Sequence, residues 1–224
     1  MKRIVSTLLL LVLLASSSFA QRRQAVNLSL SFNPTLNWLS IGGKDAQSTS
    51  VGFGYDYGLN ADFFLDKYGR YALASGLIIS NLKSSVNYNP DHDFSIGSAS
   101  YSANTPVGVD YKLSYIEIPL AFRLRTKQFN RSTFWGQFGV FTAWNFNAEA
   151  STDDGTLHRN DINKDISLYN MGLDLGIGCE YDLGEHNALS FGLIYKGGFF
   201  DIMTNNLGDK TTTKSLALQV SFIF

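Results

Sequence analysis

Apolar and polar side chains alternate, residue by residue, through most of the chain after Ala20, in about eight runs of which the last ends at Phe224. A β-strand sends successive side chains to opposite faces, so each run has one apolar face and one polar or small face. Such a strand can place its apolar face against lipid and its other face toward a polar interior. The pattern predicts an all-β fold, an eight-stranded antiparallel, up-and-down transmembrane β-barrel.

The run 51–65 shows the alternation most clearly, and 169–183 comes next. The apolar face of 51–65 carries Val51, Phe53, Tyr55, Tyr57, Leu59, Ala61, Phe63 and Leu65, and the other face of this run carries Gly52, Gly54, Asp56, Gly58, Asn60 and Asp62. A bilayer leaves no water for unpaired amides, and a closed barrel pairs them all without an open edge. An exported soluble sandwich would not need so continuous an apolar stripe.

Three places depart from simple alternation. Pro34 cannot donate a ladder hydrogen bond, so it predicts a bulge or a local break in pairing. Both faces of 77–79 are apolar, which leaves the register of that strand open. In the run 109–124 the apolar residues change parity after Tyr115, which predicts a bulge near Tyr115 or at Pro119.

The connections between the runs alternate in length. Segments 66–70, 126–132 and 182–187 are short, whereas 40–50, 89–108, 151–165 and 203–214 are longer and polar. Outer-membrane barrels have short periplasmic turns and longer extracellular loops, and an even number of strands leaves both termini in the periplasm. Eight strands satisfy these conditions.

The first twenty residues have the features of a secretory signal. Lys2 and Arg3 form a positive region, 8–14 is an apolar core, and Ser18-Phe19-Ala20 is a small-x-small cleavage site. The apolar run is too short for a spanning helix. The chain also lacks the Cys that directly follows the cleavage site of a lipoprotein. We therefore expect a cleaved signal peptide at 1–20 and one barrel domain at 21–224, in the outer membrane of a Gram-negative bacterium.

Composition agrees with this class. Hydrophobic residues make up 45% of the chain, yet the mean hydropathy is only -0.03, because polar inward residues offset apolar outward ones. Aromatic residues at 14% and 20 Gly suit lipid-facing belts and a crowded interior. The net charge of -1 argues against nucleic acid as a partner. The single Cys179 excludes an internal disulfide and is expected to have a plain apolar role.

Three segments stand out from the general alternation: Tyr115-Ile116-Glu117-Ile118-Pro119 and the glycine-rich hairpin strands 172–181 and 189–198. They resemble the PorT-like family of outer-membrane β-barrel proteins of Bacteroidetes. The Tyr-x-Glu-x-Pro segment is the more specific element, and the rest is pattern along the mature chain. The resemblance implies an eight-stranded outer-membrane barrel, and the namesake of the family is needed for type IX protein secretion.

Charged side chains on the inward faces form the first candidate site. They are Asp56, Asp62, Glu117, Arg123, Arg125, Asp174, Glu180 and Lys196. A barrel of eight strands is only wide enough for its own side chains, so these groups are expected to pair with each other, because an unpaired buried charge is costly. The alternative is a path for protons or ions. The sequence does not say which acid meets which base.

Histidines and carboxylates in the loops form a second candidate. His92 lies in Asp91-His92-Asp93, and His158 lies between Asp154 and Asp161. Such clusters can bind a metal or perform acid–base chemistry, but polar loops are more often simply solvated. His186 is read as a turn residue. No His-x-Ser pair of the lipid A deacylase kind is present, so we predict no enzyme and no cofactor.

Aromatic side chains near the strand ends predict two interfacial girdles. The outer set is Trp38, Trp144, Phe146, Tyr169 and Phe199, and the periplasmic set is Tyr71, Phe134, Tyr181, Phe222 and Phe224. A terminal aromatic such as Phe224 also resembles the signal read by the barrel-assembly machinery. The expected partners are outer-membrane lipid, that machinery and, through the family resemblance, type IX secretion proteins.

Three functions follow from the sequence, in order of preference. The first is a PorT-like component or accessory of protein secretion. The second is a structural or adhesion barrel whose loops 89–108 and 151–165 contact a host or matrix. A small-solute pore ranks third, because eight strands do not enclose an aqueous channel.

Overall fold

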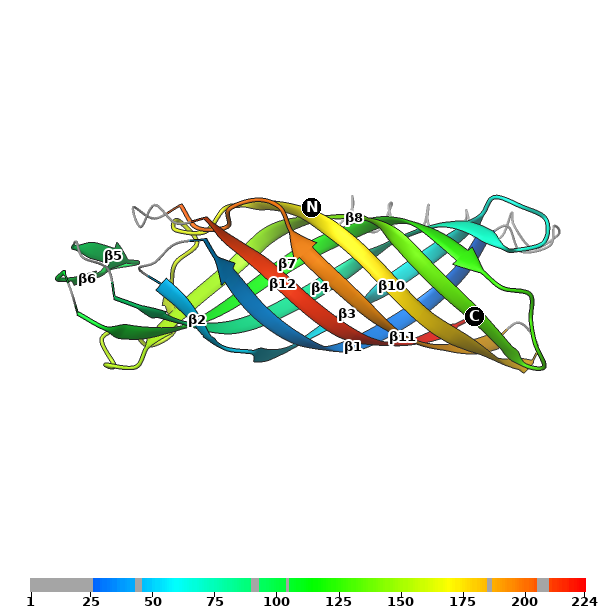
Figure 1. Ribbon diagram of the computed structural model, residues 1–224, viewed down its shortest axis with the longest axis horizontal. Helices are drawn as coiled ribbons and strands as arrows, with labels where there is room; N and C mark the ends of the chain where they lie inside the picture. Colours follow the sequence, from blue (N-terminus) through cyan, green and yellow to red (C-terminus); the bar gives the residue numbers. More distant parts are fainter. Residues whose placement is uncertain (1–25, 43–45, 90–92, 104, 185–186, 205–209) are drawn as a thin grey trace, which may run out of the picture.

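The computed structural model describes residues 26–42, 46–89, 93–103, 105–184, 187–204 and 210–224, and its regular structure is all β (Figure 1). Eight long strands form the wall: β1 (Val26–Ile41), β3 (Gly52–Phe64), β4 (Tyr71–Tyr88), β7 (Val107–Arg125), β8 (Ser132–Thr152), β10 (Tyr169–Gly184), β11 (Asn187–Gly198) and β12 (Thr211–Ile223). Short strands accompany them: β2 (Ala46–Ser50), β5 (Phe94–Ile96), β6 (Ala99–Tyr101) and β9 (Asn160–Asp161). None of the described residues belongs to a helix long and apolar enough to cross a membrane.

The wall closes on itself. Each long strand pairs antiparallel with the next one along the chain, and β12 pairs back onto β1, with Leu30 opposite Phe222 and Leu36 opposite Leu216. Closure pairs the backbone of the first and last strands, which an open sheet would leave as edges. The predicted eight-stranded antiparallel barrel is confirmed.

The two ends of the barrel differ (Figure 1). One end carries short connections, and we call it the short-turn end. There the Asp66 carboxylate accepts hydrogen bonds from the backbone N–H of Arg70 at 2.7 Å and of Tyr71 at 3.0 Å, which closes the turn between β3 and β4. The other end carries β2, β5, β6 and β9, and we call it the long-loop end.

The structure settles two of the places that depart from simple alternation, Pro34 and 77–79. Pairing of β1 with β12 is interrupted between Ser31 and Thr35 without a change of register, and the Val220 N–H donates to Asn33 Oδ1 at 3.3 Å instead. Pro34 therefore marks a local break in one ladder. On β4, Ile78 is 5% exposed and Leu77 is 56% exposed, which fixes the register that the sequence left open.

A bulge lies near Tyr115, as predicted, but it does not cause the parity change in 109–124. On β7 the odd-numbered residues face inward from Val107 to Arg123, so no side chain changes face at Tyr115. The register shift lies where Ser114 pairs with Asn147 and Tyr115 with Asn145. The extra residue is therefore Phe146, on the neighbouring strand β8.

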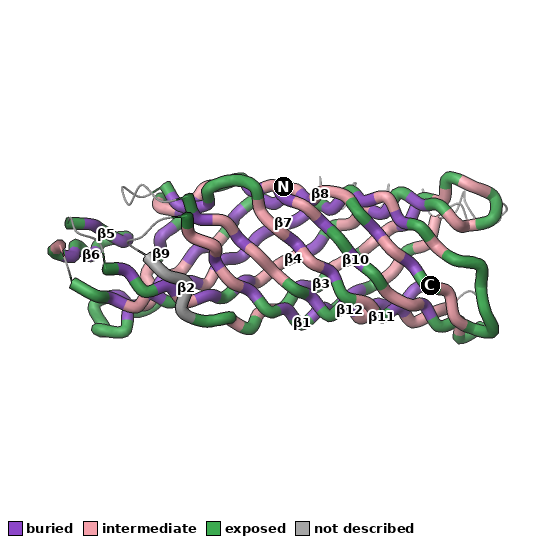
Figure 2. Tube along the Cα trace, in the orientation of Figure 1, coloured by how far each residue is buried: buried purple, intermediate pink, exposed green. Residues whose placement is uncertain are grey.

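The parity changes because the surroundings of the wall change along its length. Toward the long-loop end, β7 turns Val109 and Leu113 inward and Asp110 and Lys112 outward. Toward the short-turn end, the even-numbered residues from Ile116 onward point outward. The side chains at least 39% exposed there are Ile116, Ile118, Leu120 and Leu124. Burial alternates residue by residue along the strands (Figure 2). Toward the short-turn end the wall is thus polar inside and apolar outside, and toward the long-loop end it is apolar inside and polar outside.

Candidate functional site

The eight charged residues predicted for the interior all point into the barrel. Seven are at least nine-tenths buried: Asp56, Asp62, Glu117, Arg123, Asp174, Glu180 and Lys196. The side chain of the eighth, Arg125, is 11% exposed near the short-turn end. The barrel therefore concentrates these charges in one enclosed space, where each must find a partner.

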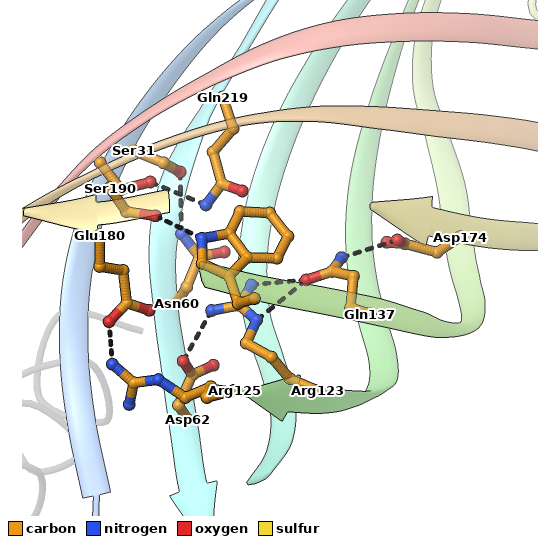
Figure 3. Close-up of polar contacts among 12 residues, drawn as sticks. Ser31, Asn60, Asp62, Arg123, Arg125, Gln137, Asp174, Glu180, Ser190 and Gln219 are labelled. Atoms are coloured by element: carbon orange, nitrogen blue, oxygen red, sulfur yellow. Dashed lines mark hydrogen bonds and ion pairs between the residues drawn. The ribbon is translucent and has the colours of Figure 1, made fainter. Parts of the chain in front are cut away.

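Arg123 is the centre of the first group. Its Nη1 lies 2.6 Å from Asp62 Oδ2, and its Nε and Nη2 donate to Gln137 Oε1 at 3.1 and 2.5 Å. Gln137 Nε2 then donates to Asp174 Oδ1 at 2.7 Å (Figure 3). This chain of contacts joins β3, β7, β8 and β10 across the interior. Arg123 thus pairs with one carboxylate directly and is linked to a second through both ends of the Gln137 amide.

Lys196 is the centre of the second group, and it reaches across the lumen. From β11, its Nζ lies 3.3 Å from Asp56 Oδ2 on β3 and 2.5 Å from Glu117 Oε1 on β7. Ser80 Oγ donates to the other oxygen of Asp56 at 2.7 Å, and Asp174 is the register partner of Lys196 on β10. One ammonium group therefore ties together strands on different sides of the wall.

A third pair lies nearest the short-turn end. Arg125 on β7 forms an ion pair with Glu180 on β10, and its guanidinium lies 5.1 Å from the centre of the Phe64 ring. The pair spans β8, the strand between them in the barrel. Together with Arg123 and Lys196 it places a cation at successive depths of the interior.

Trp135 is a central residue that the sequence analysis did not single out. Its ring is 3% exposed, its Nε1 donates to Ser190 Oγ at 3.1 Å, and the Arg123 guanidinium lies 4.6 Å from the ring centre. A Cβ at Gly178 or at Gly192 would lie 2.3 or 2.5 Å from Trp135 Cζ2. The inward glycines of β10 and β11 therefore make room for this ring, and they were the signal that a large inward residue faces them.

Little free space remains around Arg123 and Lys196, whereas cavities of about 1330 and 280 Å³ open beside Arg125 at the short-turn end. A cavity of about 30 Å³ lies beside Asp62, Arg123 and Lys196, and another of about 30 Å³ lies beside Glu117, Tyr115 and Lys196. Each has room for about one water molecule. The described lumen is filled with side chains between its two ends.

Apolar side chains fill the interior at the long-loop end. We call this part, with the loops that cover it, the loop cap. The loops contribute Phe94, Ile96, Ala99, Tyr101, Leu157, Ile162, Ile166, Ile202 and Met203, which pack on inward residues of the wall such as Val86, Val109 and Leu113. Loop-to-loop hydrogen bonds hold the cover in place, among them Gly97 N–H to Asp165 Oδ2 at 2.7 Å and Ser167 N–H to Ile202 O at 2.8 Å.

This geometry can be compared with known families. A family model described as "Outer membrane protein beta-barrel domain" matches residues 19–204, most of the chain. The chain belongs to this family. The protein is thus an integral outer-membrane barrel of a Gram-negative bacterium, as the sequence predicted, and the family match does not extend to PorT in particular.

Solved outer-membrane barrels are more distantly similar. Neisserial surface protein A is 14% identical over 88% of this chain and 96% of its own, with a TM-score of 0.48. OprG of Pseudomonas aeruginosa is 12% identical over 88% and 96%, with a TM-score of 0.46. Ail, the attachment invasion locus protein of Yersinia pestis, is 10% identical over 89% and 97%, with a TM-score of 0.39. The comparison with curated proteins found no match.

In an outer-membrane barrel the long-loop end is extracellular and the short-turn end is periplasmic. The predicted girdle residues lie on the outer wall of this barrel; Trp144 packs edge to face on Tyr169 at 5.9 Å, and Tyr169 lies 6.0 Å from Phe200. Phe224 is 45% exposed, and its N–H donates to Leu28 O at 3.0 Å. Its role as an assembly signal stays a prediction.

Of the loop histidines of this outer-membrane barrel, the described one, His158, gives no site. His158 is exposed, whereas His92 and His186 lie outside the described residues. Within the described ranges, no three His, Cys, Asp or Glu side chains come together as metal ligands. Asp154 instead accepts hydrogen bonds from its own turn, from the Thr152 hydroxyl at 2.6 Å and the Thr156 N–H at 2.9 Å.

Proposed function

We propose that this outer-membrane barrel is a non-conducting, non-enzymatic envelope protein that acts through its loop cap, in a structural or adhesive role. The observation that carries the proposal is the pairing of a side-chain-filled lumen with an apolar cap core. A solute would have to displace both to pass. We therefore assign the function to the outside of the cap.

The order of the loop cap supports this role. Its loops are tied to each other by backbone pairing, as in the bridge between Ile166 and Met203, and by side chains such as Asp165. A surface that is already ordered loses less conformational entropy when it binds a partner. Carboxylates are numerous on the described loops: Asp93, Asp153, Asp154, Asp161, Asp165 and Asp201. A partner with a basic or polar surface suits them.

Two measurements test the proposal. In planar bilayers, the purified barrel should give no steady single-channel conductance. In cells, a variant in which Gly-Ser linkers replace 93–103 and 153–166 should still migrate as a heat-modifiable barrel. It should lose adherence to host or matrix surfaces, or envelope integrity, as fully as the deletion strain does. Steady conductance in the intact barrel, or full activity without the cap loops, would overturn the proposal.

Type IX protein secretion is the second candidate, favoured by the resemblance of Tyr115-Ile116-Glu117-Ile118-Pro119 to the PorT-like family. Glu117 of this segment holds Lys196 inside the lumen, so a purely structural reason for the segment also exists. The test is to compare secreted and periplasmic proteins in the deletion strain, its complemented derivative and the parent. Cargo trapped in the periplasm would favour the secretion role, and unchanged secretion would exclude it.

A further inference from the structure

A row of charged side chains crosses the outer wall just beyond the membrane-facing band. Lys83 on β4 is the register partner of Lys112 on β7, and Lys112 is the register partner of Glu149 on β8. All three point away from the lumen. Between them and the apolar band lies one polar row, Asn81, Ser114 and Asn147.

The height of this row places it at the lipid headgroups. Ile79 and Ile116 are the last apolar outward residues of β4 and β7, and each lies four residues from the lysine on its own strand. Four residues of strand tilted by about 40° rise about 10 Å along the barrel axis. A lysine side chain there can bend back toward the interface. Lys83 and Lys112 are therefore within reach of the headgroup layer of the outer leaflet.

The cations at this site outnumber the carboxylates: Lys83, Lys112 and Arg159 stand against Asp110 and Glu149. Like charges directly opposite each other on neighbouring strands are destabilising. Glu149 is shared, with its Oε2 3.7 Å from Lys112 Nζ and 4.0 Å from Arg159 Nε, and Asp110 accepts a hydrogen bond from the Ser85 hydroxyl while keeping its charge. Lys83 forms no ion pair with any described residue. The row thus lacks an anion between its two lysines.

A shallow groove on the wall holds these groups together. Its volume is about 410 Å³, and its lining includes Phe53, Lys83, Asp110, Lys112, Glu149 and Arg159. Phe53 is 77% exposed and belongs to the apolar outward face of β3, so an apolar ring lies beside the cations of the groove. An apolar ring beside two ammonium groups matches an amphiphile with an anionic head better than a free anion.

We propose that Lys83 and Lys112 bind a phosphate group of an outer-leaflet phosphorylated glycolipid, with Phe53 against its apolar part. A phosphate offers several acceptor oxygens, so one group can accept from both ammonium ions and remove their repulsion. Arg159 stands at the side of the same groove, with its side chain 72% exposed. The proposal goes beyond the role of the loop cap and concerns the wall below it.

The test uses the full mature chain, refolded in detergent and then presented with bisphosphorylated lipid A, with dephosphorylated lipid A or with inorganic phosphate. Bound lipid is counted by native mass spectrometry. The wild-type barrel should retain the bisphosphorylated lipid at least tenfold more tightly than the dephosphorylated one. The variant K83Q/K112Q should lose this preference. F53S should weaken both lipids without removing the preference.

The matched control is K67Q/K127Q, which removes the same charge from exposed positions at the short-turn end. It should bind like the wild type. Equal retention of the two lipids by the wild type, an unchanged preference in K83Q/K112Q, or an equal loss in the control would overturn the proposal. So would inorganic phosphate that competes as well as the lipid does. The comparison of lipids on the wild type needs no variant, so a folding defect would not hide the answer.

Discussion

Lys196 is a buried cation that the barrel holds across its own interior. Asp56, Glu117 and Asp174 surround it, and it is 7% exposed. A buried ion pair adds little net stability compared with apolar packing, but removal of one partner leaves the others uncompensated. The value of Lys196 thus lies in fixing which strands face each other across the lumen.

The variant K196Q should be strongly destabilised. It leaves three buried carboxylates without their shared cation, which costs about 3–5 kcal/mol in unfolding free energy. Urea unfolding in lipid vesicles, followed by tryptophan fluorescence, measures this. K164Q, at an exposed loop position, is the control and should unfold like the wild type. Equal midpoints for K196Q and the wild type would contradict the cross-lumen role.

The glycine at 178 leaves the space that Trp135 occupies. A Cβ there would lie 2.3 Å from Trp135 Cζ2 and 2.3 Å from Phe191 O. G178A should therefore lose about 1–3 kcal/mol of stability through overpacking. The control is G136A, whose added Cβ would have Gly176 O as its nearest neighbour, at 3.9 Å. Similar unfolding midpoints for the two variants would show that Trp135 adapts freely.

At the scale of the element, the loop cap is a small hydrophobic core built on strand extensions. Ile162 is 2% exposed and packs in this core, and a Cβ added at Gly97 in the β5–β6 turn would lie 3.1 Å from its Cγ2. The wall strands supply most of their large inward apolar side chains where they pass beyond the membrane, and a small cluster of Trp135, Ile194 and Ala217 lies deeper in the lumen. Cap and membrane-spanning wall are therefore stabilised by different side chains of the same strands.

I162A should loosen the cap while leaving the barrel closed. Loss of a buried Ile side chain costs about 2–5 kcal/mol. In intact cells, externally added protease should cut the loops of I162A at least several-fold faster than those of the wild type. The barrel should still shift on gels between unheated and boiled samples. If protease cut both proteins at the same rate, the cap core would not be what orders the loops.

The stability of the turn 152–157 should depend on pH. Hydrogen bonds from the Thr152 hydroxyl and from the N–H and hydroxyl of Thr156 lower the pKa of Asp154. Because the folded pKa is below the unfolded one, this stabilisation is complete above the ordinary Asp pKa of about 3.9. It disappears as pH falls through the lowered value. Carbon-detected NMR of the Asp154 carboxyl and amide exchange at Thr156 measure it, and D154N should lack the transition.

At the scale of the whole molecule, alternation was enough to predict the barrel. The run 51–65 alternates so regularly because lipid meets every second side chain along it. Which charges meet, such as Lys196 with Glu117, depends on the stagger between strands far apart in sequence. Periodicity within a single strand does not contain that stagger.

The run 109–115 was misread for another reason. Its apolar residues Val109, Tyr111 and Leu113 have the spacing of lipid-facing side chains, but they are at most 3% exposed in the cap core. Alternation reports which residues share a face, and it does not report whether that face meets lipid or a protein core. Only the neighbouring loops, which pack over these residues, decide between the two.

The reversal of polarity along the wall predicts three classes of position on one strand. With Cys179 replaced by Ser, spin labels can be placed singly by Cys substitution at Ile118, Lys112 and Val109. The label at 118 should be accessible to oxygen in lipid, the label at 112 to a water-soluble nickel reagent, and the label at 109 to neither. A label at 112 with lipid-like accessibility would place the boundary elsewhere.

Because of the same reversal, the hydrophobic thickness of the barrel is set by which side chains face outward and not by the length of the strands. The strands run on without interruption past the bilayer, and what stops the lipid is the point where apolar side chains change sides, near Ser114 and Phe146. Suppose that, at the boundary, one ring of inward side chains and the adjacent ring of outward side chains exchanged apolar for polar residues. The membrane-spanning part would then become longer or shorter while every strand kept its pairing. A barrel of this kind could be refitted to a thinner or thicker membrane by a few paired substitutions, with its height unaltered.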